Sequence, residues 1–161
     1  MSTLDQAFRQ ELFSFVPPLN LLCVTNPSQQ HVSNASPVRF NTVQTSSGSA
    51  ISFRINNGEI QLLTPGIYMV SYHLCASLHS AATPSELAIF LTANGILVPG
   101  SMACMESEAD KKQFLSLQTF FEVADNTTLK KPFPVILHLI NGSSDSVMVS
   151  QACISVIKLS P

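Results

Sequence analysis

A Pro-Gly turn followed by a long strand with apolar residues on both faces most constrains how this chain can fold. Pro65 fixes its own φ angle and Gly66 can adopt a positive φ, so the turn after Leu63 is sharp. From Ile67 to Leu78 the side chains alternate between two faces, and both faces are largely apolar. A strand buried on both sides needs a second sheet or a neighbouring subunit. The segment therefore predicts a layered all-β domain.

The chain is poor in charge, and this limits both its surface and its partners. Charged residues make up 11% of the 161 residues, against about 25% in an average domain, while hydrophobic residues make up 45%. Such a surface must be covered by neutral polar side chains or hidden in an assembly. The formal net charge of −2, without any basic run, gives no basis for binding nucleic acid or an anionic membrane. No segment has the roughly 18 continuous apolar residues of a membrane-spanning helix.

The first 20 residues differ from the rest and are predicted to be an N-terminal extension of one domain over residues 21–161. Residues 4–13 carry a weak helical pattern, which Pro17 and Pro18 end. The start of the chain mixes charges and lacks the basic start, apolar middle and cleavage site of a secretory signal. We therefore expect synthesis in a cytoplasm without export by that route.

Short β-type segments separated by turn residues fill the remainder of the chain. Asn57-Gly58 is expected to form a type I′ hairpin turn, and Asn94-Gly95 a second turn. The expected loops cover residues 27–37, 45–49, 80–85 and 101–112, and the last of these is expected to be mobile. The expected strands are 21–25, 38–43, 50–55, 59–63, 67–78, 87–93, 96–98, 114–123, 135–140 and 147–159. About ten short strands without a long helix predict an antiparallel jelly-roll sandwich.

Three segments, taken together, resemble a known family of jelly rolls. Residues 60–72 run from an apolar strand into Pro-Gly-x-Tyr and then into a strand with alternating aromatics. Residues 88–101 contain Asn-Gly followed by Val-Pro-Gly-Ser, and residues 152–160 look like a terminal strand. In this order the segments resemble tumour-necrosis-factor-like (TNF-like) and complement-subcomponent-q-like domains, over about residues 36–160. The bacterial branch is the most similar, namely the collagen-like glycoprotein heads and basal-layer proteins of the exosporium.

The resemblance implies a non-catalytic homotrimer that acts as a structural protein of the spore surface, in the exosporium or coat. Its partners would be copies of itself and other spore-surface or coat proteins. The alternative is a secreted complement-like or cytokine-like ligand module that binds a receptor or a glycan. In such jelly rolls, aromatic residues of the inner sheet pack around a threefold axis. The residues implied at the trimer interface are Tyr68, Tyr72, His73, Phe121 and Ile157. For the two tyrosines, a role as core fillers stays open.

The four cysteines show no spacing typical of a metal site or a redox motif. Cys75 and Cys153 fall inside expected strands and are read as small buried hydrophobic residues. Cys23, near the N-terminus, and Cys104, in the charged loop, are candidates for cross-linking between chains. The sequence contains no phosphate-binding loop, nucleophile elbow or carboxylate pair with a defined geometry. We therefore expect no enzyme activity, no cofactor and no metal.

Overall fold

The computed structural model describes residues 19–80, 83–124 and 133–159, and within these ranges every regular element is a β-strand. The single all-β domain confirms the predicted fold class, with twelve strands rather than about ten. The strands are β1 (Asn20–Asn26), β2 (Gln30–Val32), β3 (Thr42–Ser47), β4 (Ile51–Arg54), β5 (Glu59–Leu62), β6 (Gly66–Leu78), β7 (Ser85–Ala93), β8 (Ile96–Leu97), β9 (Ala103–Ser107), β10 (Gln113–Val123), β11 (Val135–Asn141) and β12 (Val147–Lys158).

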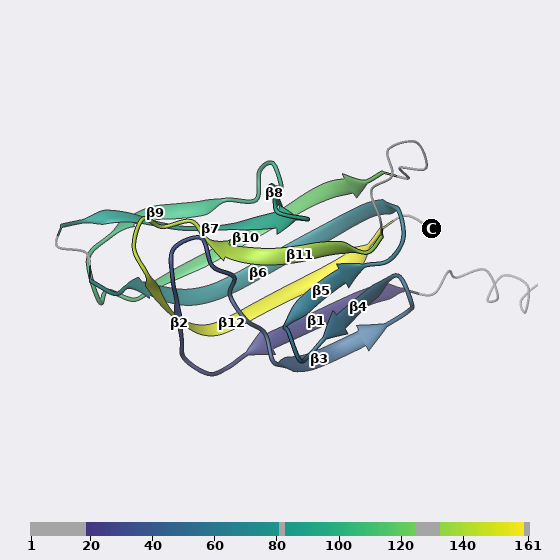
Figure 1. The fold of residues 1–161 in the computed structure, drawn as a ribbon, viewed down its shortest axis with the longest axis horizontal. Coiled ribbons are helices and arrows are strands. Elements are labelled where there is room, and N and C mark those ends of the chain that lie inside the picture. Colours follow the sequence, from purple (N-terminus) through teal and green to yellow (C-terminus); the bar gives the residue numbers. More distant parts are fainter. Residues whose placement is uncertain (1–18, 81–82, 125–132, 160–161) are drawn as a thin grey trace, which may run out of the picture.

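The strands form two antiparallel sheets that pack face to face (Figure 1). The first sheet has the order β10-β6-β12-β1-β3, with β2 paired to one end of β12. The second has the order β4-β5-β11-β7-β8, with β9 also paired to β7. Strands that are neighbours in a sheet are often distant in sequence, as β1 and β12 are, and this crossing over is typical of a jelly roll.

The long strand after the Pro-Gly turn lies near the middle of the first sheet, between β10 and β12. Gly66 opens it with a φ of 142°. Tyr68, Val70, Tyr72 and Leu74 are all buried and point between the sheets. The core is completed from the second sheet by β7 and β11, whose buried residues are Leu87, Ile89, Leu91, Leu137 and Leu139. On the opposite face of the long strand, Ile67 and His73 are exposed, Met69 and Ser71 are half-buried, and only Cys75 and Ser77 are buried.

The two Asn-Gly turns differ in conformation. Asn94 and Gly95 have φ angles of 49° and 77°, the paired positive values of a type I′ turn between β7 and β8. At the earlier hairpin only Gly58 has a positive φ, and its N–H donates to the carbonyl of Arg54 at 2.8 Å. The prediction of a type I′ turn at Asn57-Gly58 is therefore wrong. The chain needs a longer turn there because β4 ends at Arg54 and β5 starts only at Glu59.

Three expected loops contain strands. Residues 30–32 pair with β12, residues 42–47 pair with β1, and residues 103–107 pair with β7. The predictions of a loop at 27–37, of a flexible segment from residue 45 and of a mobile loop at 101–112 are wrong for these parts. Residues 38–41 were expected to begin a strand over residues 38–43. The strand β3 begins only at Thr42, so these residues lie outside it.

The expected helical pattern at residues 4–13 lies outside the described residues. The boundary between an extension at residues 1–20 and a domain from residue 21 stays a prediction. Strand β1 begins at Asn20 and pairs with the end of β12, so the two ends of the described chain lie side by side. Within the described ranges, no helix is long and apolar enough to cross a membrane.

Candidate assembly face

The structure places the two tyrosines inside the chain. Tyr68 is 0% exposed and Tyr72 is 1% exposed, with both rings in the core between the sheets. The expectation that their side chains face another subunit is therefore corrected. They fill the core of the single chain, which is the alternative that the sequence left open. The reason is the strand period of two, because both tyrosines share the face that carries Val70 and Leu74.

Tyr72 links the two sheets through its hydroxyl group. The hydroxyl lies 3.0 Å from the carbonyl oxygen of Ile89 and 2.9 Å from that of Ser101, and it accepts from the N–H of Ala103 at 3.2 Å. Burial raises the pKa of Tyr72 to about 12, so the hydroxyl stays protonated as a donor. The ring thus supplies a large apolar area and a satisfied polar end, which is why Tyr suits this position.

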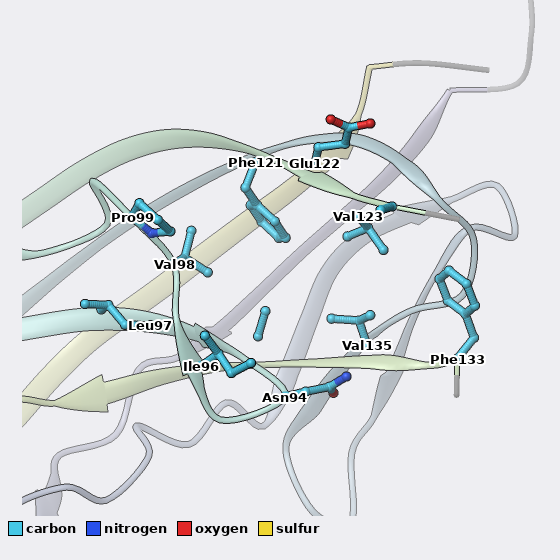
Figure 2. A pocket seen from close by; sticks show the side chains of 12 residues that line it. Asn94, Ile96, Leu97, Val98, Pro99, Phe121, Glu122, Val123, Phe133 and Val135 are labelled. Atoms are coloured by element: carbon cyan, nitrogen blue, oxygen red, sulfur yellow. The ribbon is translucent and has the colours of Figure 1, made fainter. Parts of the chain in front are cut away.

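Phe121 also points inward, although part of its ring remains accessible. It stacks on Tyr68, with ring centroids 6.3 Å apart and an interplanar angle of 28°. Its other side lines an apolar cavity of about 250 Å³ between the ends of β10 and β11 and the β7–β8 hairpin (Figure 2). Glu122 is the one ionisable side chain of this lining, and Figure 2 shows its carboxylate directed away from the apolar groups. The cavity can hold an apolar group and offers no acid–base pair.

The outer face of the first sheet carries a continuous row of apolar side chains. Register pairs Phe120 with Met69, Met69 with Ile157, and Ile157 with Leu21, so the row crosses four strands. Phe120 is 55% exposed and the other three residues are half-buried. We call these four residues the apolar row. Ile157 is one of the predicted interface residues, and the structure places it at the centre of this row.

Two exposed side chains extend the apolar row toward the end of the sheet. The N–H of Leu159 donates to the carbonyl of Ile67 at 2.8 Å, and these side chains are 53% and 45% exposed. In a soluble monomer, contiguous exposed apolar surface of this kind is uncommon and often marks a contact site.

Toward the opposite end of the same face the rows become polar. The next row consists of Gln118, Ser71, Ser155, Cys23 and Thr45. The row after it contains Ser116, His73, Cys153 and Thr25. His73 is exposed, so this predicted interface residue also lies on the outer face, in a polar setting. Contact of His73, Phe121 and Ile157 with another subunit stays a prediction.

The cysteines occupy three different environments. Cys75 is buried, as predicted, and Cys104 is exposed on β9 of the second sheet. Cys23 and Cys153 are half-buried on the outer face of the first sheet, and their Sγ atoms lie 3.7 Å apart. Cys153 is therefore not the fully buried residue that the sequence suggested. The contact of its thiol with Cys23 was not foreseen, because residues 130 positions apart meet only through sheet pairing.

The side chains of the described ranges form no cluster of metal ligands. No group of three or more His, Cys, Asp or Glu residues lies close enough there to hold a metal ion. Every buried side-chain nitrogen or oxygen in the same ranges has a hydrogen-bond partner. The apolar row is therefore the candidate contact surface within the described ranges.

Similar proteins are found through structure and not through sequence. No family model matches the sequence, and no curated protein matches it. The globular domain of zebrafish complement 1qA protein aligns with a TM-score of 0.60 at 12% identity, over 88% of this chain and 98% of that chain. The Eiger TNF of S. frugiperda aligns with a TM-score of 0.60 at 13% identity, over 89% and 94%. Murine APRIL at pH 5.0 aligns with a TM-score of 0.59 at 11% identity, over 88% and 99%.

The chain has the complement-1q and TNF jelly-roll fold. This confirms the broader part of the sequence resemblance. At 8–13% identity the likeness shows the fold alone. A particular similarity to exosporium proteins stays a prediction.

Proposed function

We propose that this protein is a non-catalytic assembly module that forms a homotrimer through the outer face of its first sheet. The observation that carries the proposal is the apolar row of Phe120, Met69, Ile157 and Leu21, which crosses four strands on a face that the single chain leaves open. Covering such a row removes apolar surface from water, at about 25 cal/mol for each Å² buried. The low charge fraction of 11% also supports burial of part of the surface in an oligomer.

A pair of substitutions on one strand tests the proposal. Phe120 and Gln118 both lie on the outer face of β10 and both are exposed, but only Phe120 belongs to the apolar row. In Phe120→Asp a charge enters the proposed contact, and burying an unpaired charge is strongly unfavourable. We expect sedimentation equilibrium to give about three times 17.4 kDa for the wild type and for Gln118→Asp, and the mass of one chain for Phe120→Asp.

Circular dichroism separates loss of assembly from loss of folding. Because Phe120 is more than half exposed, Phe120→Asp should keep the β-sheet spectrum of the wild type. A monomeric wild type, or a Phe120→Asp protein that remains trimeric, contradicts the proposal.

The spore surface remains our proposed location, and it rests on the sequence resemblance alone. The partners there would be other spore-surface or coat proteins. The alternative function, a complement-like or cytokine-like ligand module, would use the same trimer and add a recognition surface for a receptor or glycan. Immunogold labelling of intact spores and of culture supernatant would separate the two, because a ligand module appears in the supernatant and a coat protein on the spore.

A further inference from the structure

The two half-buried thiols on the outer face of the first sheet form a contact that the assembly function does not need. Cys23 on β1 and Cys153 on β12 come from adjacent antiparallel strands, and their Sγ atoms are 3.7 Å apart. The residues are not directly opposite one another, since Cys23 pairs with Ser155 and Cys153 pairs with Thr25. They are diagonal neighbours whose side chains point toward each other on one face.

Both cysteines stand next to irregularities in their sheet pairing. The pairing of β12 with β6 shifts between Ser150 and Cys153, where Gln151 has a φ of 54°. The pairing of β1 with β3 shifts directly after Cys23. Bulges increase the local twist of a strand and redirect its side chains, which lets diagonal neighbours approach. A disulfide has an S–S distance of about 2.05 Å, so the sulfurs need to close by roughly 1.7 Å.

We propose that Cys23 and Cys153 form an intrachain disulfide by exchange with a low-molecular-weight disulfide such as oxidised glutathione. The Cys23 thiolate attacks one glutathione sulfur, the S–S bond of glutathione breaks, and one glutathione leaves and takes up a proton. The Cys153 thiolate then attacks the Cys23 sulfur, and the second glutathione leaves with the other proton. Two protein thiols are oxidised, and one glutathione disulfide is reduced to two thiols.

The surroundings of Cys153 favour this order of attack. Burial, followed by the hydrogen bond with Cys23 and the charge of Cys23, raises the pKa of Cys153 to about 11. Cys153 is therefore protonated at neutral pH and is the poorer attacker of an external disulfide. Once Cys23 carries glutathione, its thiol hydrogen bond with Cys153 is gone, which removes one of the causes that raise the pKa of Cys153. The second step is also intramolecular and therefore fast, so the mixed disulfide between Cys23 and glutathione should not accumulate.

The bond would join the first strand of the described chain to the last one. It closes a loop across 130 positions, and a cross-link over a long loop restricts the unfolded chain most strongly. It also removes Cys23 from the candidates for cross-linking between chains. The exposed Cys104 on the second sheet then remains as the candidate for that role.

The test uses the full chain with Cys75→Ala and Cys104→Ser, so that only the pair remains. After incubation with oxidised glutathione, we expect mass spectrometry to show loss of two hydrogen atoms and no bound glutathione. Non-reducing electrophoresis should show a single chain, and peptide mapping should show Cys23 linked to Cys153. The melting temperature should rise by roughly 10 °C and return after reduction. The matched control adds Cys153→Ser and should keep one glutathione on Cys23.

Three results overturn the proposal: a stable glutathione adduct on Cys23 while Cys153 is present, a disulfide between chains through Cys23, or both thiols left unreacted. The experiment is repeated in the Phe120→Asp chain and with wild-type cysteines. A lack of reaction can then not be explained by burial of the two thiols in the assembly or by the substitutions at Cys75 and Cys104. Unreacted thiols in all of these chains refute the disulfide and leave the trimer proposal untouched, whose own readout is the mass in solution.

Discussion

The two faces of β6 are both rich in apolar residues, yet the fold uses them in different ways. On the inner face Tyr68, Val70 and Tyr72 are each at most 1% exposed. On the outer face Ile67 is 45% exposed and Met69 is half-buried. Alternation along a strand separates two faces but does not say which one is the core. The inner face also satisfies the two tyrosine hydroxyls, because that of Tyr72 bonds to Ser101 across the core and that of Tyr68 bonds to Thr64 beside the Pro-Gly turn.

The comparison teaches that one strand can serve folding and assembly through opposite sides. The inner face packs against β7 and β11 within one chain, so its side chains determine the free energy of unfolding. The outer face belongs to the apolar row, so its side chains should determine association. Substitutions on the two faces of β6 should therefore change two different measured quantities.

The largest expected effect comes from removing an inner side chain. Tyr72→Ala deletes a fully buried ring, and a change of this kind lowers the free energy of unfolding by about 3–5 kcal/mol. Met69→Ala on the outer face should lower it by less than about 1 kcal/mol. Urea unfolding of both variants in the Phe120→Asp background measures the difference without a contribution from assembly. Equal losses at the two positions would show that the faces are not distinct.

A smaller effect is expected when the ring stays and only its hydroxyl is removed. Tyr72→Phe leaves the N–H of Ala103 and the carbonyl of Ser101 without this partner, which should cost about 1–3 kcal/mol. Tyr68→Phe is the control on the same face, because its hydroxyl donates to Thr64 close to the Pro-Gly turn at 2.6 Å. Thr64 is only half-buried, so water can replace the bond and the loss should be smaller. A loss at Tyr68 that equals the loss at Tyr72 would place both hydroxyls in the same environment.

Local signals in the sequence predicted much of the fold. Pro65-Gly66 opens the long strand where expected, and Asn94-Gly95 forms the hairpin turn. These predictions were correct because positive φ angles and the fixed φ of proline act within a few residues. The positions of the long strands along the sequence followed from apolar runs between such turns.

The errors fall on strands at or near the edges of the sheets. β3 is exposed along its whole length, and β9 carries Glu106 while pairing only with β7. Such strands need no apolar run, because one side has no neighbour and charge there prevents pairing with other chains. Polar sequence therefore looks like loop, although the backbone pairs as a strand.

The composition of the candidate face was less predictable than the fold. Phe120 and Ile157 meet across the sheet only through Met69, and Cys23 reaches Cys153 through the pairing of β1 with β12. Register between strands so far apart is set by the packing of the whole sheet, and a single sequence does not encode it in any short segment. The alternation of side chains along the long strand did place Met69 and His73 on the face opposite the tyrosines. The two faces could therefore be told apart from the sequence, although the residues that each face contacts could not be predicted.

The smallest expected effect is a loss of stability at alkaline pH that depends on the inner face. The pKa of Tyr72 is raised from 10.0 to about 12 in the folded chain, chiefly by burial. Between these values the unfolded chain loses the phenolic proton while the folded chain keeps it, so stability falls as pH rises above 10 and is unaffected below it. At about pH 11 this group should account for no more than about 1.4 kcal/mol. Unfolding in urea at about pH 8 and about pH 11 should thus show a steeper decline for the wild type than for Tyr72→Phe. Because Tyr68 and Cys153 keep their raised pKa values in both proteins, equal declines would mean that water reaches the Tyr72 hydroxyl and that the inner face is less closed than its burial indicates.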